Sequence, residues 1–140
     1  MENSILVQSF IEQIWNKRAF DTIDLFLHPN FKDHSLLPTL PPTKEGLKKW
    51  ILATGLAFDH NTVLEDMVAE NQQIMVRVKM KLKHIGVWRG IEPTGMELFT
   101  IGYRHFKIID NKIVEHWALI DGENIENQLK EASLGCKINP

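Results

Sequence analysis

The sequence predicts an α+β protein in which helices pack on one face of a curved, mainly antiparallel sheet. Two observations carry this prediction. Apolar residues recur at helical spacing in roughly the first 55 positions, and from Asn61 onward they alternate with polar residues, which is the period of a strand. The 140 residues are enough for one domain with its own core, and we expect a single domain over residues 1–140.

The first segment predicts two helices. Ser4 is a plausible N-cap for a helix that runs to about Arg18. Its apolar positions form one stripe: Ile5, Leu6, Phe10, Ile11, Ile14 and Trp15. A short second helix begins near Asp21 and is stopped by His28-Pro29-Asn30, because the residue before proline disfavours helical geometry.

Phe31 to His34 is predicted to be a short extended piece, and Pro38 to Pro42 a stiff loop. A third helix then begins with Thr43 as its cap. Its inner stripe consists of Leu47, Trp50, Ile51 and Thr54. Gly55 is expected to weaken or end this helix, because glycine frees the backbone.

The next segments predict strands. Val63 to Glu70 is one strand, followed by a turn at Glu70-Asn71. In the next strand Ile74, Val76, Val78, Met80 and Leu82 alternate with Met75, Arg77, Lys79, Lys81 and Lys83, which predicts one buried face and one basic, solvated face. The long connection His84 to Gly95 contains three glycines and a proline, and such loops often line or gate a site.

Glu97 to Ile109 and the run from Lys112 are predicted to form a hairpin around Asp110-Asn111. Strict alternation in the final strand places Ile113, Glu115, Trp117, Leu119 and Asp121 on one face and His116 on the other, unless a bulge intervenes.

Asp121 allows two interpretations. An acid that follows Trp117 and Leu119 on one face is placed to be poorly solvated, and poor solvation raises a carboxyl pKa toward the range that suits acid/base catalysis. Asp121 also precedes a predicted helix, Gly122 to Lys130, and aspartate is a favoured N-cap. The sequence leaves both roles open.

Composition excludes several function classes. The net charge of −2 provides no general attraction for nucleic acid or anionic membranes, and no apolar stretch has the length of a membrane span. The N-terminus lacks the features of a signal peptide, and Cys136 has no second cysteine to pair with. We therefore expect a cytoplasmic protein that binds neither nucleic acid nor membrane.

The search for chemistry leaves acid/base catalysis as the main option. The six histidines show no close zinc spacing, so no metal is expected, and neither a serine nucleophile motif nor a phosphate-binding glycine loop occurs. The candidate proton carriers are Asp121, His34, His105 and His116. Aromatic side chains are expected to line a hydrophobic pocket: Trp15, Trp50, Trp88, Phe99, Tyr103 and Trp117.

Three stretches carry a family resemblance. They are Phe31-Lys-Asp-His34 with Leu37 to Gly46, then His84-x-Gly86 with Gly90-Ile-x-Pro-Thr-Gly95, and finally Asn111 to Trp117 ending on Asp121. Together they resemble the SnoaL-like polyketide cyclases, also called ester cyclases, of the nuclear transport factor 2-like superfamily. This resemblance implies a cone-shaped, cystatin-like fold with a bent sheet wrapped around the N-terminal helices.

The resemblance also implies a function. Enzymes of this type close a polyketide ring by aldol condensation without metal or organic cofactor, with an aspartate matching Asp121 as acid/base and pocket histidines, matched here to His34 and His105, assisting. We therefore expect a cofactor-independent enzyme that cyclises, isomerises or hydrolyses a small hydrophobic or carbonyl-containing compound, as a homodimer or homotetramer. The alternative is a non-catalytic ligand-binding or dimerisation module on the same fold.

Overall fold

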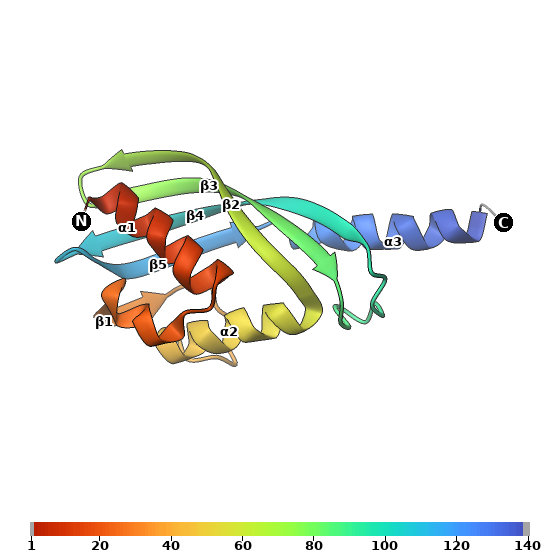
Figure 1. Cartoon of the computed structure of the whole chain (residues 1–140), viewed down its shortest axis with the longest axis horizontal. Helices are drawn as coiled ribbons and strands as arrows, with labels where there is room; N and C mark the ends of the chain where they lie inside the picture. The colour runs from red at the N-terminus through yellow and green to blue at the C-terminus, as the bar shows by residue number, and fades with distance from the viewer. Residues whose placement is uncertain (1, 139–140) are drawn as a thin grey trace.

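In the computed structural model, which describes residues 2–138 and the side chains up to residue 132, five strands form one curved, unclosed sheet (Figure 1). The strand order is β1-β5-β4-β3-β2. Their bounds are β1 Leu27–Asp33, β2 Phe58–Glu70, β3 Gln73–His84, β4 Glu97–Ile109 and β5 Lys112–Ile120. β1 runs parallel to β5, and the other neighbours are antiparallel. The predicted α+β class with a mixed, curved sheet is confirmed.

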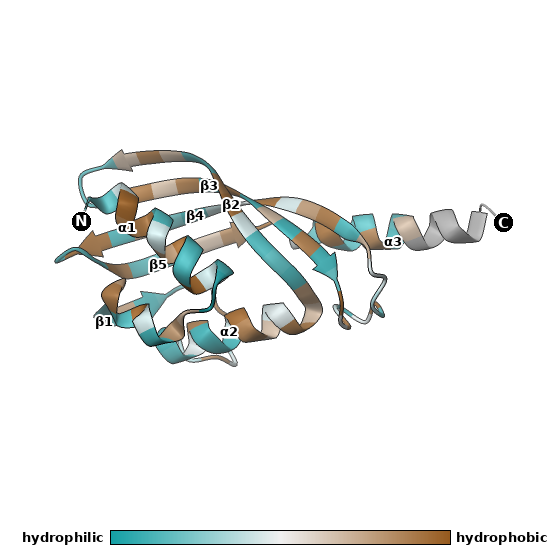
Figure 2. Ribbon diagram, viewed as in Figure 1, coloured by the Kyte–Doolittle hydropathy of each residue, from teal (hydrophilic) through white to brown (hydrophobic). Residues whose placement is uncertain are grey.

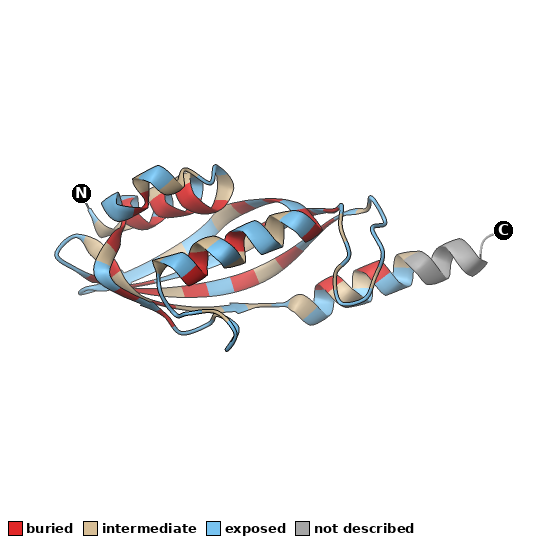
Figure 3. Cartoon of the chain, turned by 90° about the horizontal axis from the view of Figure 1, so that it is seen from below, coloured by how far each residue is buried: buried red, intermediate tan, exposed pale blue. Residues whose placement is uncertain are grey.

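Helices cover one face of this sheet, called the inner face below. Figure 3 shows that α1 (Asn3–Phe10) and α2 (Lys44–Ala57) lie on the same side, with their buried residues turned toward the strands. α3 (Gly122–Ile138) follows β5 and extends beyond the end of the sheet (Figure 1). Within the described residues, none of the helices combines the length and apolar character that crossing a bilayer requires.

The predicted first helix exists but changes its winding. α1 continues without a break into a π-helical stretch, η1 (Ile11–Asn16), and Glu2 rather than Ser4 occupies the N-cap position. At the end of η1 the side-chain amide of Asn16 forms hydrogen bonds with both backbone groups of Thr62, a residue of edge strand β2. Its Nδ2 donates to the carbonyl oxygen (2.9 Å), and its Oδ1 accepts from the amide (2.8 Å). This contact fixes the preceding residue, Trp15, over the inner face.

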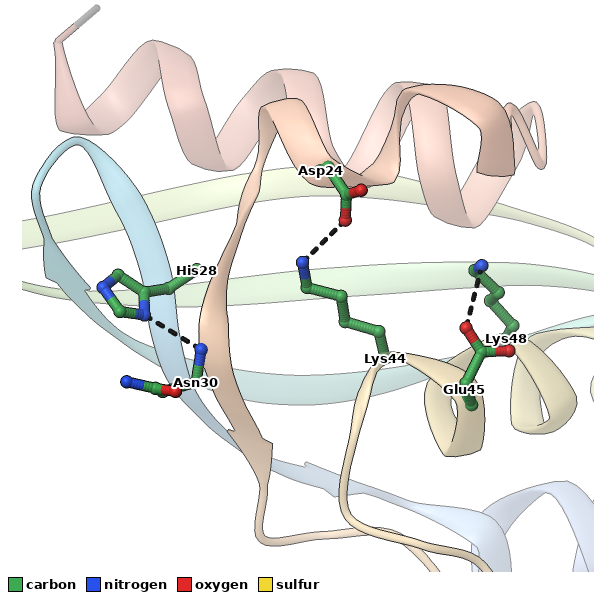
Figure 4. Close-up of polar contacts among 6 residues, drawn as sticks. All are labelled: Asp24, His28, Asn30, Lys44, Glu45 and Lys48. Carbon is green, nitrogen blue, oxygen red and sulfur yellow. Dashed lines mark hydrogen bonds and ion pairs between the residues drawn. The ribbon is translucent and has the colours of Figure 1, made fainter.

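The second predicted helix is a 3-10 helix, η2 (Phe20–Leu25), and the strand expected from Phe31 already begins at Leu27. Proline is tolerated inside β1 because this strand lies at the edge of the sheet. Figure 4 shows how η2 meets the start of α2, where Lys44 Nζ donates to Asp24 Oδ1 at 2.6 Å. Gly55 lies inside α2 and does not end it, so that expectation was wrong.

Alternation along β3 is as predicted. The apolar residues of this strand are buried on the inner face: Ile74, Val76, Val78, Met80 and Leu82. The residues that alternate with them, which include the lysines, face outward. Figure 2 shows alternating hydrophobic and hydrophilic bands along the strands. Asp110 and Asn111 both have positive φ angles (53° and 60°), which is the geometry of the predicted tight hairpin turn.

The final strand departs from strict alternation. The pairing of β4 with β5 shifts between Lys107 and Ile108, so Ile113 and His116 both turn to the inner face although they are three positions apart, an odd spacing. A bulge of this kind inserts one residue and reverses the phase of the strand beyond it. The predicted face of Ile113 is therefore wrong relative to Trp117 and Glu115.

Candidate functional site

A cavity of about 510 Å³ opens between α2, the inner face of the sheet, the loop 85–96 and the start of α3. Trp15, Trp50 and Trp88 line it, as do the aliphatic side chains of Met80 and Leu82. Its size and mainly apolar wall are typical of sites for small organic ligands.

The loop 85–96 is anchored at both ends. At its start the amides of Ile85 and Gly86 donate to the carbonyl oxygen of Ala57, at 2.9 and 3.0 Å. At its end the fully buried His84 accepts a hydrogen bond at Nδ1 from the Thr94 amide (3.2 Å). Because both ends are fixed, the residues between them hold a defined position at the mouth of the cavity.

Trp88 and Arg89 form that mouth. The ring of Trp88 packs edge-on against Phe58, with centroids 5.4 Å apart, and the guanidinium of Arg89 lies 4.5 Å from the Trp88 ring centroid. Both side chains line the cavity. The glycines and proline of this loop predicted that it lines or gates a site, but Arg89 itself was not among the predicted functional residues.

A buried polar chain runs from β1 through β5 to β4. The side chain of Asp33 is 1% exposed; its Oδ1 accepts hydrogen bonds from the amide (2.9 Å) and hydroxyl (2.6 Å) of Ser35. Its Oδ2 lies 2.9 Å from Nδ1 of His116. Nε2 of His116 is in turn 3.4 Å from Nη1 of Arg104, at the long end for a hydrogen bond. Arg104 lines the cavity, so the chain ends at the ligand space.

The charges along this chain follow from its surroundings. Burial is the main cause that lowers the pKa of His116, and the charge of Arg104 adds to it, against the hydrogen bond with Asp33. Burial alone would raise the pKa of Asp33, but the hydrogen bonds from His116 and Ser35 outweigh it and keep this pKa below its ordinary value. Burial lowers the pKa of Arg104 to about 10, which leaves it charged near pH 7.

We therefore assign a neutral His116 between an ionised Asp33 and a charged Arg104. In this assignment Nδ1–H of His116 donates to Asp33, and Nε2 accepts from Arg104. The guanidinium also lies 4.3 Å from the ring centroid of Trp15. Its Nε is buried and has no hydrogen-bond partner among the described residues.

Two of the predicted proton carriers lie outside this site. His34 and His105 are on the outer face of the sheet, where they stack on opposite sides of Trp117 with centroid distances of 4.7 and 4.9 Å. His34 Nε2 is 3.1 Å from Glu115, and His105 Nε2 is 2.7 Å from Gln73. The expectation that these histidines serve the pocket does not hold, because His105 in β4 and His34 just after β1 lie against Trp117 on the outer face and neither lines the cavity.

Three of the predicted aromatic positions are corrected for the same reason. Phe99, Tyr103 and Trp117 lie on the outer face, and neither Phe99 nor Tyr103 is buried. Trp15, Trp50 and Trp88 line the cavity. His116 is buried behind Arg104 and does not itself line the cavity, so its place is that of a positioning residue.

Asp121 is exposed, and its Oδ1 accepts a hydrogen bond from the Asn124 amide at 2.9 Å, which is the geometry of an N-cap for α3. The expectation of a poorly solvated carboxyl is wrong, because the strand ends before this residue. Its neighbours Ile120 and Gly122 do line the cavity, so Asp121 lies at the rim.

Sequence reasoning missed Asp33 and Arg104. The signal for Arg104 was present, because it shares the alternation phase of Phe106 and Ile108 on the buried side of β4. Asp33 gave no such signal, since its partner His116 is 83 positions away. Among the residues that the structure describes, no group of three or more possible metal-binding side chains comes together. Cys136 lies outside the described side chains.

A model of the SnoaL-like polyketide cyclase family matches residues 5–129. The chain belongs to this family. Solved structures similar to this SnoaL-like protein include IdmH, a proposed polyketide cyclase of Streptomyces antibioticus. The two sequences are 21% identical. The alignment covers 93% of this chain and 99% of IdmH, with a TM-score of 0.83. A proposed polyketide cyclase of Acidithiobacillus ferrooxidans has 18% identity, coverage of 93% and 95%, and a TM-score of 0.81.

AclR, a proposed hydroxylase of Streptomyces galilaeus, has the same fold, with 21% identity, coverage of 92% and 96%, and a TM-score of 0.77. No curated protein matches this SnoaL-like chain. Because proteins named for different reactions share the fold, the fold does not select the reaction. Family membership supports a class of cofactor-independent enzymes that act on small ligands, and leaves the substrate open.

Proposed function

We propose that this protein is an enzyme that acts by acid/base chemistry on a small hydrophobic carbonyl compound, in an aldol cyclisation, an isomerisation or a hydrolysis. One observation supports this most directly: the buried guanidinium of Arg104 faces a cavity walled by tryptophans and aliphatic side chains. A cation in such a place stabilises negative charge that develops on a substrate oxygen.

The physical reason is electrostatic. Removing a proton next to a carbonyl group leaves an enolate, whose charge rests mainly on oxygen. A guanidinium that is already positioned and shielded from water stabilises that charge more strongly than water does. Trp15 and His116 hold Arg104 in place, so little reorganisation is needed during the reaction.

Asp121 is our candidate for the group that exchanges the proton. It lies at the rim of the cavity between two residues that line it. A carboxylate in this position reaches a substrate that fills the cavity and also exchanges its proton with solvent. His116 and Asp33 act through Arg104 and do not touch the substrate.

The experiment needs no knowledge of the natural substrate. 2-Tetralone is a bicyclic aromatic ketone whose α-protons exchange with D2O through an enolate, and proton NMR follows this exchange. We expect the protein to accelerate the exchange and Asp121→Asn to reduce the acceleration by about 100-fold, the lower range for general acid/base catalysis. Asparagine is as good an N-cap as aspartate, so this change isolates the carboxylate from its structural role.

Asp110→Asn is the matched control, because it removes a carboxylate that is 85% exposed in the hairpin turn. It should leave the exchange rate unchanged. Exchange no faster than in buffer, or equal rates for the wild type and Asp121→Asn, would contradict the proposed function.

One observation favours the non-catalytic alternative. The carboxylate of Asp121 is engaged as a helix cap, and no aspartate or glutamate side chain of the described residues lines the cavity. A ligand-binding module would bind 2-tetralone in the cavity without accelerating its exchange. The same NMR samples therefore separate the two functions.

We also propose that two copies of the chain associate through the outer face of the sheet. Tyr103 and Leu119 are paired across β4 and β5 and are 50% and 77% exposed. They adjoin the stacked ring of Trp117. The lysine-rich strand β3 lies beside β4 at the border of this apolar patch, and a charged border around an apolar centre is typical of protein interfaces.

A further inference from the structure

The charges around the cavity are unbalanced at its mouth. Two guanidinium groups line the cavity, Arg104 and Arg89, and no carboxylate side chain of the described residues does. The charge of Arg104 already has a counterion, because Asp33 faces it through His116. Arg89 forms no ion pair within 4.0 Å in the described part of the chain. Arg89 is therefore the cavity guanidinium that has no ion-pair partner within 4.0 Å among the described residues.

Arg89 is held in place although it is exposed. One contact of its guanidinium is the ring of Trp88, at 4.5 Å from the centroid. Its Nη2 also lies near Gly122 at the start of α3, 2.7 Å from the position that a Cβ there would take. The guanidinium therefore lies at the mouth between Trp88 and the start of α3.

Arg89 occupies the first position of a tight two-residue turn. Trp88 and Ile91 exchange backbone hydrogen bonds of 3.0 and 2.8 Å, and the positive φ angles of Arg89 (+47°) and Gly90 (+74°) belong to this turn. The turn places Arg89 next to Trp88 at the mouth of the cavity.

Asp121 directly precedes Gly122, but it forms no ion pair with Arg89 within 4.0 Å, and its Oδ1 accepts a hydrogen bond from the Asn124 amide. A ligand that enters past Trp88 therefore meets a guanidinium whose hydrogen-bond donors are not engaged by a carboxylate of the described residues.

We propose that Arg89 determines specificity for a substrate that carries a carboxylate, so that the natural ligand is a hydrophobic keto acid. Its apolar body lies among the tryptophans, its carbonyl oxygen faces Arg104, and its carboxylate binds Arg89 at the mouth. The planar guanidinium matches a carboxylate with two parallel hydrogen bonds. This assignment names the substrate class of the proposed function and rests on it for the carbonyl group; the carboxylate is an independent inference.

The test compares two ligands of equal shape. One is 2-tetralone with a carboxylate on its aromatic ring at position 6, and the other is the corresponding carboxamide. Isothermal titration calorimetry gives the Kd of each. We expect the wild-type protein to bind the carboxylate about fivefold more tightly than the carboxamide, the upper range for a partly exposed ion pair. Arg89→Gln should bring the two Kd values to within about twofold, and Arg89→Lys should retain part of the preference.

Lys130→Gln is the control, because it removes one positive charge from the solvent side of α3, where Lys130 pairs only with Glu126 at 3.6 Å. It should keep the full preference. Equal Kd values for the two ligands in the wild type would overturn the inference, as would a preference that survives Arg89→Gln unchanged.

The two proposals fail separately. If unsubstituted 2-tetralone exchanges its protons in an Asp121-dependent manner but the carboxylate gives no advantage in binding, the proposed function stands and the role of Arg89 falls. If the carboxylate preference depends on Arg89 but no exchange is accelerated, the site binds organic acids and the catalytic proposal falls.

Discussion

Replacing Asp33 with asparagine should destabilise the protein strongly, although the two side chains have nearly the same shape. The Oδ1 atom of asparagine can keep both hydrogen bonds from Ser35. Its amide group, however, would replace the Oδ2 atom that accepts from Nδ1 of His116 at 2.9 Å. Two donors would then face each other.

Moving the proton of His116 from Nδ1 to Nε2 does not solve the conflict. Nε2–H would then face Nη1 of Arg104, which is also a donor. In either tautomer one buried donor lacks an acceptor. Arg104 also loses the carboxylate that balances its charge through His116. Breaking a buried ion pair on one side typically costs about 3–5 kcal/mol, a large part of the total stability of a domain.

The assay is urea unfolding followed by tryptophan fluorescence and circular dichroism, with the free energy of unfolding extrapolated to water. The loss should appear also as a decrease in Tm of roughly 10 °C or more. Asp24→Asn, which removes an exposed carboxylate paired with Lys44, should leave both values close to the wild type. A loss below about 1 kcal/mol for Asp33→Asn, as in a solvent-screened pair, would refute the coupled chain of charges.

Three further predictions concern pH, the helix cap and assembly. Burial lowers the pKa of both His116 and His60 in the folded protein. Below the ordinary histidine pKa of about 6.5, the unfolded chain therefore binds more protons than the folded protein. The free energy of unfolding should fall as the pH decreases through that value, by up to about 1.4 kcal/mol per pH unit for each histidine. His116→Asn should reduce this slope in urea titrations between pH 5 and 7, and an unchanged slope would contradict the assignment of a neutral His116. Asp121→Ala should cost about 1 kcal/mol and Asp121→Asn almost nothing, because only alanine removes the cap; equal losses in denaturant titrations would show that Oδ1 does not cap α3. Leu119→Lys should convert a dimer into a monomer in analytical ultracentrifugation, whereas Leu25→Lys, at a 64% exposed position of η2, should not; a dimer that persists in Leu119→Lys would place the interface elsewhere.

The helices, strands and turns could be predicted from the sequence because each depends on residues that are close together in the chain. The alternation in β3 follows from one apolar face, and the Asp110-Asn111 turn follows from two residues that tolerate positive φ. Neither needs knowledge of distant contacts. The positions of Trp15 and Trp50 also followed from helical stripes that must face a sheet.

The site was harder to predict because its geometry depends on register. One shifted pair between β4 and β5 turns His116 inward together with Ile113 and leaves Trp117 outward. Strict alternation had grouped Ile113 with Trp117. His34 and His105 looked like pocket residues by analogy, and only the pairing of His105 with Trp117 shows that they share the opposite face.

Asn16 has a second consequence beyond the placement of Trp15. Strand β2 is an open edge of the sheet, and open edges are where foreign strands add and aggregation begins. The amide of Asn16 occupies the outward N–H and C=O groups of Thr62, which an incoming strand would need. The last turn of η1, which also positions Trp15 at the ligand cavity, thus protects this edge strand from aggregation.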